Sequence, residues 1–244
     1  FTEDENRHTN PTTLIDKKGK IIYKQSILYN KDSFDFSHNI KIGKAHYDAN
    51  DSLINEPIDF TKANNLPLQD LQQILQSVLF PLSVPKKQRF NLTKEDDIFL
   101  KQYLSQYPSE TSFPKYDTTE YYDSYVKFFF QNSIHTMPLN IRVFNKVGWS
   151  YGFLTDASYI VDFTNKIEFM LTATVYVNSD DILNDDKYDY ETIGHPFLYQ
   201  LGQTIYNYEL QRTRKYKPDL SNFKMNYGQR NPNDLRYSIK SADN

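Results

Sequence analysis

The stretch from Leu139 to Asn178 reads LNIRVFNKVGWSYGFLTDASYIVDFTNKIEFMLTATVYVN and predicts three consecutive strands. We expect them at 140–145, 151–163 and 167–177, with a turn at 164–166. The third strand carries an apolar side chain at every second position, at Ile167, Phe169, Leu171, Ala173, Val175 and Val177. This period of two is typical of a strand with one buried face, so the stretch predicts an antiparallel meander.

Segments before and after this meander have the apolar periodicity of helices. Apolar residues recur every three or four positions between Pro67 and Pro81, and a second helix should begin at Thr93, with Asp96 completing a capping box, and end before Pro108. An aromatic helix is expected over 121–130, and a last helix over 196–212, where Gly202 would permit close contact with the sheet. The predicted fold class is therefore α+β, an antiparallel sheet (meander 139–178) packed with helices.

The rest of the chain is less regular. Residues 20–28 predict a strand paired with Leu14-Ile15, and 30–55 a long surface loop or short hairpins. We divide the chain into an irregular segment 1–60, a domain 61–217 and a polar tail 218–244 without regular structure. Because the chain begins at Phe1 rather than Met, it is interpreted as a fragment of a longer protein or a processed product.

Composition excludes several classes of function. A net charge of −3 and a pI near 6.0 give no electrostatic case for binding nucleic acid. No apolar run approaches the roughly 20 residues of a membrane-spanning helix. Cysteine is absent, which excludes disulfides, thiolate catalysis and cysteine-ligated metal.

The histidines, His8, His38, His46, His135 and His195, stand far apart in the sequence. None shares helical i, i+4 spacing with another, so a metal site or histidine catalysis would require tertiary convergence. Ordinary surface or core histidines are the favoured interpretation. The acidic run 178–186 favours a solvated turn over a calcium loop, and we predict neither metal nor cofactor.

The triplet Lys146-Val147-Gly148 falls between the first two strands. In this context the stretches NKVGWSYGFLTDASYIVDF, IEFMLTATVYVN and YDYETIGHPFLYQLGQTIYNYE resemble bacterial β-lactamase-like serine hydrolases, relatives of the penicillin-binding proteins. The resemblance covers roughly 57–212 and is strongest from 139 to 210. In that family a Lys-Thr/Ser-Gly triplet lies on a strand beside the active-site cleft.

The resemblance implies roles for four residues. Lys146 would be a fixed positive charge in the cleft that orients a substrate carboxylate and tunes proton transfer. Gly148 would let substrate approach the strand backbone, the Trp149 N–H would be an oxyanion donor, and Ser150 would add a hydroxyl at the cleft edge.

Three features depart from the family pattern. Val147 replaces the hydroxyl residue of the triplet, which should weaken the binding of a carboxylate ligand. The only Tyr-x-Asn, 176–178, follows Lys146 instead of preceding it. The family's nucleophile motif, Ser-x-x-Lys, has four matches, which we interpret as chance matches: Ser83/Lys86, Ser112/Lys115, Ser124/Lys127 and Ser221/Lys224.

We therefore expect the C-terminal portion of a β-lactamase-like hydrolase, with the nucleophile and the N-terminal part of the fold absent, and an inert chain as given. The strand 167–177 would then be an apolar edge covered by residues 14–28, an upstream piece or another chain. The resemblance implies a cell-wall peptide or β-lactam-like ligand and a periplasmic or extracellular location. The alternative is a non-catalytic binding or structural module, with Trp149 and Tyr151 lining a cleft for a cell-wall peptide or a protein partner.

Overall fold

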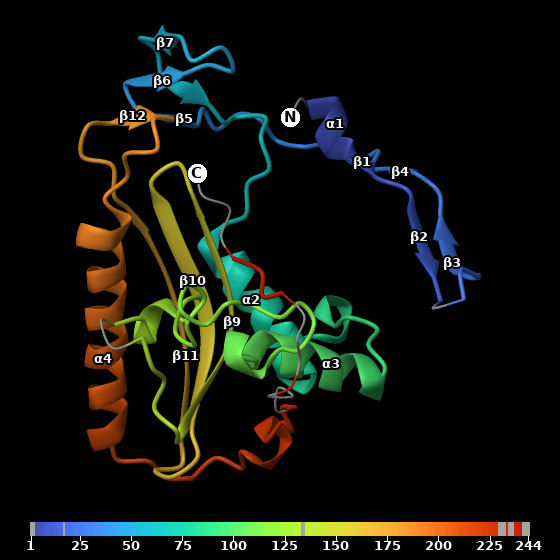
Figure 1. Cartoon of the computed structure of the whole chain (residues 1–244), viewed down its shortest axis with the longest axis vertical. Helices are drawn as coiled ribbons and strands as arrows, with labels where there is room; N and C mark the ends of the chain where they lie inside the picture. The colour runs from blue at the N-terminus through green and yellow to red at the C-terminus, as the bar shows by residue number, and fades with distance from the viewer. Residues whose placement is uncertain (1–2, 17, 133–134, 229–232, 234–236, 241–244) are drawn as a thin grey trace. The chain divides into compact units, whose positions relative to one another are not determined.

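The computed structural model describes residues 3–16, 18–132, 135–228, 233 and 237–240. The chain divides into two compact units, one made of 1–66 and 180–186, the other of 67–179 and 187–244. Each is described by itself. The molecule is mixed α+β, with small antiparallel sheets and a few helices, as the sequence predicts (Figure 1).

The second unit is built on the predicted meander. Strands β9 (Ile141–Ser150), β10 (Phe153–Asp162) and β11 (Ile167–Tyr176) form an antiparallel sheet in the order β11-β10-β9. Ile160 of β10 lies opposite Val143 and Phe169, which fixes the register. The meander is therefore confirmed.

The first strand is longer than predicted. Residues 146–148 lie inside β9 and pair with Ala157, Asp156 and Thr155, whereas the sequence predicted that the strand ends at Asn145. Trp149 and Ser150 continue the ladder up to a tight turn at Tyr151 and Gly152, both with positive φ. Gly148 lies within this ladder, and the strand ends only at Tyr151 and Gly152, whose positive φ values suit a two-residue hairpin turn.

The sheet is covered on both faces. One cluster joins the sheet side chains Ile141, Val143, Leu154 and Ile160 to Leu198 of α4 (His195–Gln211) and to the three phenylalanines of the 3₁₀ turn η4 (Phe128–Phe130). The other joins Phe144, Ala157, Tyr159 and Val161 to Leu75 and Leu79 of α2 (Leu68–Leu79). Leu220 and, from η6 (Ser221–Phe223), Phe223 complete this second cluster. Figure 1 shows α4 along one side of the sheet, opposite α2.

Helix α3 (Lys94–Ser105) packs against β9 and begins at Thr93. The Thr93 hydroxyl accepts from the Asp96 backbone N–H and the Asp96 carboxylate accepts from the Thr93 N–H, so the predicted capping box is confirmed. Short 3₁₀ turns η1 (Pro81–Ser83), η2 (Lys86–Gln88) and η3 (Pro108–Glu110) connect these elements.

The predicted aromatic helix over 121–130 is wrong. The segment forms turns and then η4, whose three consecutive phenylalanines are all buried. A helix would bury only one face of such a run. Here the turn lies between the sheet and α4 and is enclosed by both. Gly202 of α4 allows this contact, because a Cβ there would lie 2.4 Å from the Phe129 carbonyl oxygen.

The first unit consists of short pieces. Helix α1 (Glu3–Arg7) leads into β1 (His8–Thr9), which pairs with β4 (Leu28–Tyr29), and β2 (Thr12–Ile15) pairs with β3 (Ile21–Gln25), as predicted for a hairpin there. The remaining strands are β5 (Lys41–Ile42) with β8 (Ile58–Asp59), and β6 (Ala45–Tyr47) with β7 (Leu53–Ile54) and β12 (Ile182–Leu183).

Strand β11 pairs only with β10 within the described residues, and α4 packs on a face of β11. Covering of the β11 edge by residues 14–28, an upstream piece or another chain stays a prediction. None of the described helices combines the length and the apolar character needed to cross a membrane.

Candidate ligand-binding cleft

The four residues singled out from the sequence do not form one site. Lys146 is exposed and its Nζ donates to the neighbouring Val147 carbonyl oxygen at 2.5 Å. Side chains alternate across a strand, so Lys146 and Ser150 lie on the sheet face opposite Trp149. Gly148 has open space around its Cα, because no neighbouring atom lies within 4 Å of the position that a Cβ would take. Of the four, Trp149 lines a cavity.

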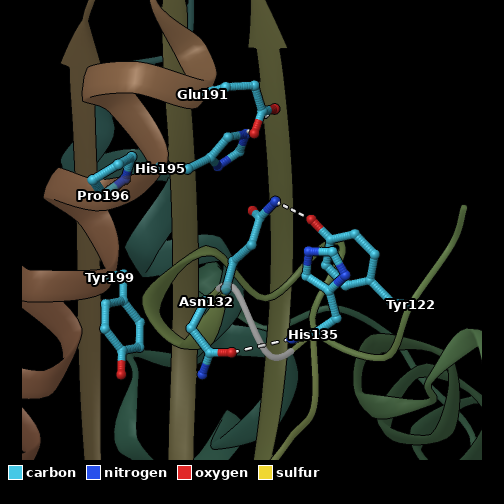
Figure 2. Close-up of a pocket in the computed structure, with 8 residues that line it drawn as sticks. Tyr122, Asn132, His135, Glu191, His195, Pro196 and Tyr199 are labelled. Atoms are coloured by element: carbon cyan, nitrogen blue, oxygen red, sulfur yellow. Dashed lines mark hydrogen bonds and ion pairs between the residues drawn. The ribbon is translucent and has the colours of Figure 1, made fainter.

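That cavity lies on the α4 side of the sheet. Its larger part, of about 510 Å³, is lined by Tyr122, Gln131, Asn132, His135, Glu191, His195, Pro196 and Tyr199. A smaller part of about 80 Å³ is lined by Tyr125, Phe128, Gln131, Trp149, Tyr190, Glu191 and His195. We call the two together the cleft, because Gln131, Glu191 and His195 line both. Figure 2 shows Glu191 and His195 at one end of the larger part, with Asn132 between Tyr122 and Tyr199.

One wall of the cleft comes from the start of α4. A π-helical turn, η5 (Tyr190–Gly194), precedes the helix and places Glu191 and His195 four residues apart on one side. Gly194 permits a close approach at this point, because a Cβ there would lie 2.3 Å from the Leu154 Cδ1 atom of β10. The close approach of η5 to the sheet thus sets the position of both polar side chains.

His195 is held as a neutral ring. Burial lowers the pKa of its imidazole, and the Glu191 carboxylate opposes this only in part. The Nε2 atom lies 3.6 Å from Glu191 Oε1, and Phe128 contacts the ring edge-on with centroids 4.8 Å apart. The Nδ1 atom is buried and has no hydrogen-bond partner in the described part of the chain.

The opposite wall comes from the irregular segment around η4. Gln131 Nε2 donates to the Tyr122 hydroxyl at 2.6 Å, while its Oε1 is buried without a partner among the described residues. The His135 ring stacks on Tyr122 with centroids 3.7 Å apart and planes 7° apart. His135 and His195 therefore line one cleft, although they are sixty residues apart in the sequence. No local sequence pattern could have predicted that they share a site.

A buried polar network anchors the floor of the cleft. Lys127 donates to Asn145 Oδ1 at 2.5 Å and to the Leu104 carbonyl at 2.9 Å. Asn145 and Ser158 both donate to the Asp156 carboxylate, which also accepts the Phe128 backbone N–H at 3.1 Å. All four side chains of the network are buried. This network ties the start of η4 to β9 and β10.

The same segment contains one of the Ser-x-x-Lys matches. The Ser124 hydroxyl is buried without a hydrogen-bond partner in the described ranges, and the Lys127 ammonium is bonded elsewhere. A serine nucleophile needs hydrogen-bond contact with its base, and this pair does not make one. The geometry agrees with the interpretation of this match as chance.

Within the residues that the structure describes, no group of three or more His, Asp or Glu side chains converges closely enough to hold an ion. Comparison with protein-family models, curated proteins and solved structures found no match. The function is therefore argued from the cleft.

Proposed function

We propose that this chain is a binding module whose ligand occupies the cleft. The observation that carries the proposal is a concave site that combines aromatic faces with polar side chains from elements far apart in the sequence. Glu191 and His195, at the start of α4, line both parts of the cleft, and so does Gln131 from the segment around η4. A mostly aromatic site with a few convergent polar groups is typical of a ligand pocket.

The rest of the lining supports binding. Aromatic rings from Tyr122, Tyr125, Trp149, Tyr190 and Tyr199 offer large apolar faces with few rotatable bonds. A cavity of several hundred Å³ with convergent polar groups is typical of small-molecule and peptide sites. The described lining contains no Ser, Thr or Lys, which favours recognition over acyl transfer through a serine.

Trp149 allows a direct test, because it is the only tryptophan of the chain and it lines the cleft. We expect aromatic or peptide-like fragments to shift the Trp149 indole N–H signal in a ¹⁵N NMR screen. His195→Ala should weaken these hits about tenfold through loss of a hydrogen bond and a packing surface. The matched control, His38→Ala, changes an exposed histidine in the other unit and should have no effect.

The opposite result would contradict the proposal. Hits that bind equally well to His195→Ala, while its thermal unfolding matches that of the wild type, would place the ligand outside the cleft. A screen in which no fragment moves the Trp149 signal would count against a ligand site there altogether.

We keep a second candidate, the C-terminal portion of a β-lactamase-like serine hydrolase, periplasmic or extracellular as the resemblance implies. Two observations favour it: a three-stranded antiparallel meander with helices on both faces, and the open space at Gly148. In an intact protein the chemistry would be acyl transfer, with Lys146 as the fixed charge. Binding of a carboxylate ligand such as a β-lactam to this chain, weakened in Lys146→Ala, would favour this candidate over the binding module.

A further inference from the structure

We infer that the cleft selects ligands that carry a positively charged amine. This inference rests on the proposed function and specifies the class of ligand. Two features of the lining support it: an uncompensated carboxylate and a set of aromatic faces beside that carboxylate.

The carboxylate belongs to Glu191. Its side chain is 82% exposed, and its ion-pair partner is His195, at 3.6 Å. Because burial lowers the pKa of His195, this ring is neutral at pH 7 and leaves the negative charge of Glu191 uncompensated. Neither part of the cleft is lined by Lys or Arg within the described residues. The lining therefore carries a net negative charge.

The field of this carboxylate reaches the aromatic wall. Burial raises the pKa of the Tyr122 and Tyr125 hydroxyls, and the charge of Glu191 raises both further. The remaining titratable groups of the lining are His135, Tyr190 and Tyr199, and none of them carries a permanent positive charge. A ligand cation thus meets one acidic group and no Lys or Arg in this described lining.

The smaller part of the cleft has the composition of a cation-binding cage. Tyr125, Phe128, Trp149 and Tyr190 surround a space of about 80 Å³ that Glu191 also lines. Trp149 meets Tyr125 and Phe128 at ring-centroid distances of 6.2 and 5.9 Å. Aromatic faces attract ammonium groups through the quadrupole of the ring. This space is large enough for an ammonium head group, and the 510 Å³ part would hold the remainder of the ligand.

The test uses three probes of nearly equal size: phenethylamine, 2-phenylethanol and phenylacetate. Each is titrated into the intact chain to about 10 mM while the Trp149 indole N–H signal is followed. We expect the amine to bind about tenfold more tightly than the alcohol, as is typical of a charge-assisted hydrogen bond, and phenylacetate to bind most weakly. Glu191→Gln should remove the preference for the amine. The matched control Glu95→Gln removes the same charge from an exposed position of α3 and should retain it.

The outcomes separate this inference from the proposed function. If the alcohol or phenylacetate binds as tightly as the amine, or if Glu191→Gln retains the preference, the amine selectivity is wrong and the binding cleft stands. If none of the probes, and no fragment of a wider screen, moves the Trp149 signal, both fail. Glu191 is exposed, so its substitution should leave thermal unfolding unchanged, and this is verified in the same samples.

Discussion

The side-chain amide of Asn145 donates to the carboxylate of Asp156 at 2.9 Å, across two neighbouring strands and inside the core. Asn145 also accepts from Lys127, so one neutral amide connects a buried ammonium to a buried carboxylate. Asp156 in turn accepts the backbone N–H of Phe128. The floor of the cleft is therefore attached to the sheet through polar bonds as well as packing.

Asn145→Ala should be strongly destabilising. The substitution leaves two buried charges short of hydrogen bonds, and breaking such networks costs about 3–5 kcal/mol. Urea unfolding measures this loss. The control Asn207→Ala, at an exposed position of α4, should change the free energy of unfolding by less than about 0.5 kcal/mol. Similar values for both variants would show that the network contributes little.

Stability should depend on pH through the same network. Burial lowers the pKa of Lys127 to about 7, against the opposing charge of Asp156. Between pH 7 and the ordinary lysine pKa of about 10.4, the unfolded chain binds more protons at this position than the folded chain. The free energy of unfolding should therefore rise with pH over this range, as the cost of a buried charge is relieved.

The variant Lys127→Met has no amine to titrate at this position, so it serves as the reference for the wild type. Urea unfolding at intervals from pH 7 to 9.5 should show the wild type gaining stability relative to Lys127→Met as the pH rises. A constant difference between the two proteins would mean that Lys127 keeps an ordinary pKa in the folded state. Burial raises the pKa of Asp156 to about 6, so its contribution has the opposite slope and lies below this range.

Gly202→Ala should destabilise the protein, against the usual preference of helices for alanine. In an exposed helix position this change stabilises by about 1 kcal/mol, but here the new Cβ would lie 2.4 Å from the Phe129 carbonyl oxygen. We expect a loss of about 1–3 kcal/mol in urea unfolding, as for other overpacked sites. Gly228→Ala is the control, because no atom lies within 4 Å of its added methyl group. Unchanged or increased stability of Gly202→Ala would contradict the close contact between α4 and η4.

Lys146→Ala distinguishes the two candidate functions. Lys146 is exposed and hydrogen-bonds only to the adjacent carbonyl within the described set of contacts, so its loss should change stability by less than about 0.5 kcal/mol. Binding of fragments in the cleft, measured at Trp149, should be unaffected. A loss of affinity for carboxylate ligands in this variant would instead favour the role that the hydrolase resemblance gives to Lys146.

Much of the second unit could be predicted from local patterns. The alternation of apolar residues over 167–177 and the turn at 164–166 predicted two strands of the meander, and Thr93 with Asp96 predicted the start of α3. These features are encoded by residues close together in the sequence. The alternation of apolar residues indicates a strand, and the capping residues indicate where a helix begins, without reference to the rest of the fold.

The cleft could not be predicted in the same way. His135 and His195 line one cleft because elements far apart in the sequence pack together, with α4 close to η4 at Gly202 and η5 close to β10 at Gly194. The run of phenylalanines predicts a helix, but its conformation is set by other elements: the Phe128 N–H donates to Asp156 of β10, and Asn145 of β9 donates to the Val126 carbonyl just before η4. Lys146 was expected at a strand end, but the ladder continues to the turn at Tyr151.

The position of a bound fragment tests the central claim most directly. We would determine the crystal structure of the chain with phenethylamine or with a stronger hit from the Trp149 screen. The binding-module proposal predicts the ligand between η5 and the 122–135 segment, with its ammonium about 2.8 Å from a Glu191 carboxylate oxygen. A ligand bound instead on the opposite face of the sheet, beside Lys146 and Gly148, would contradict it.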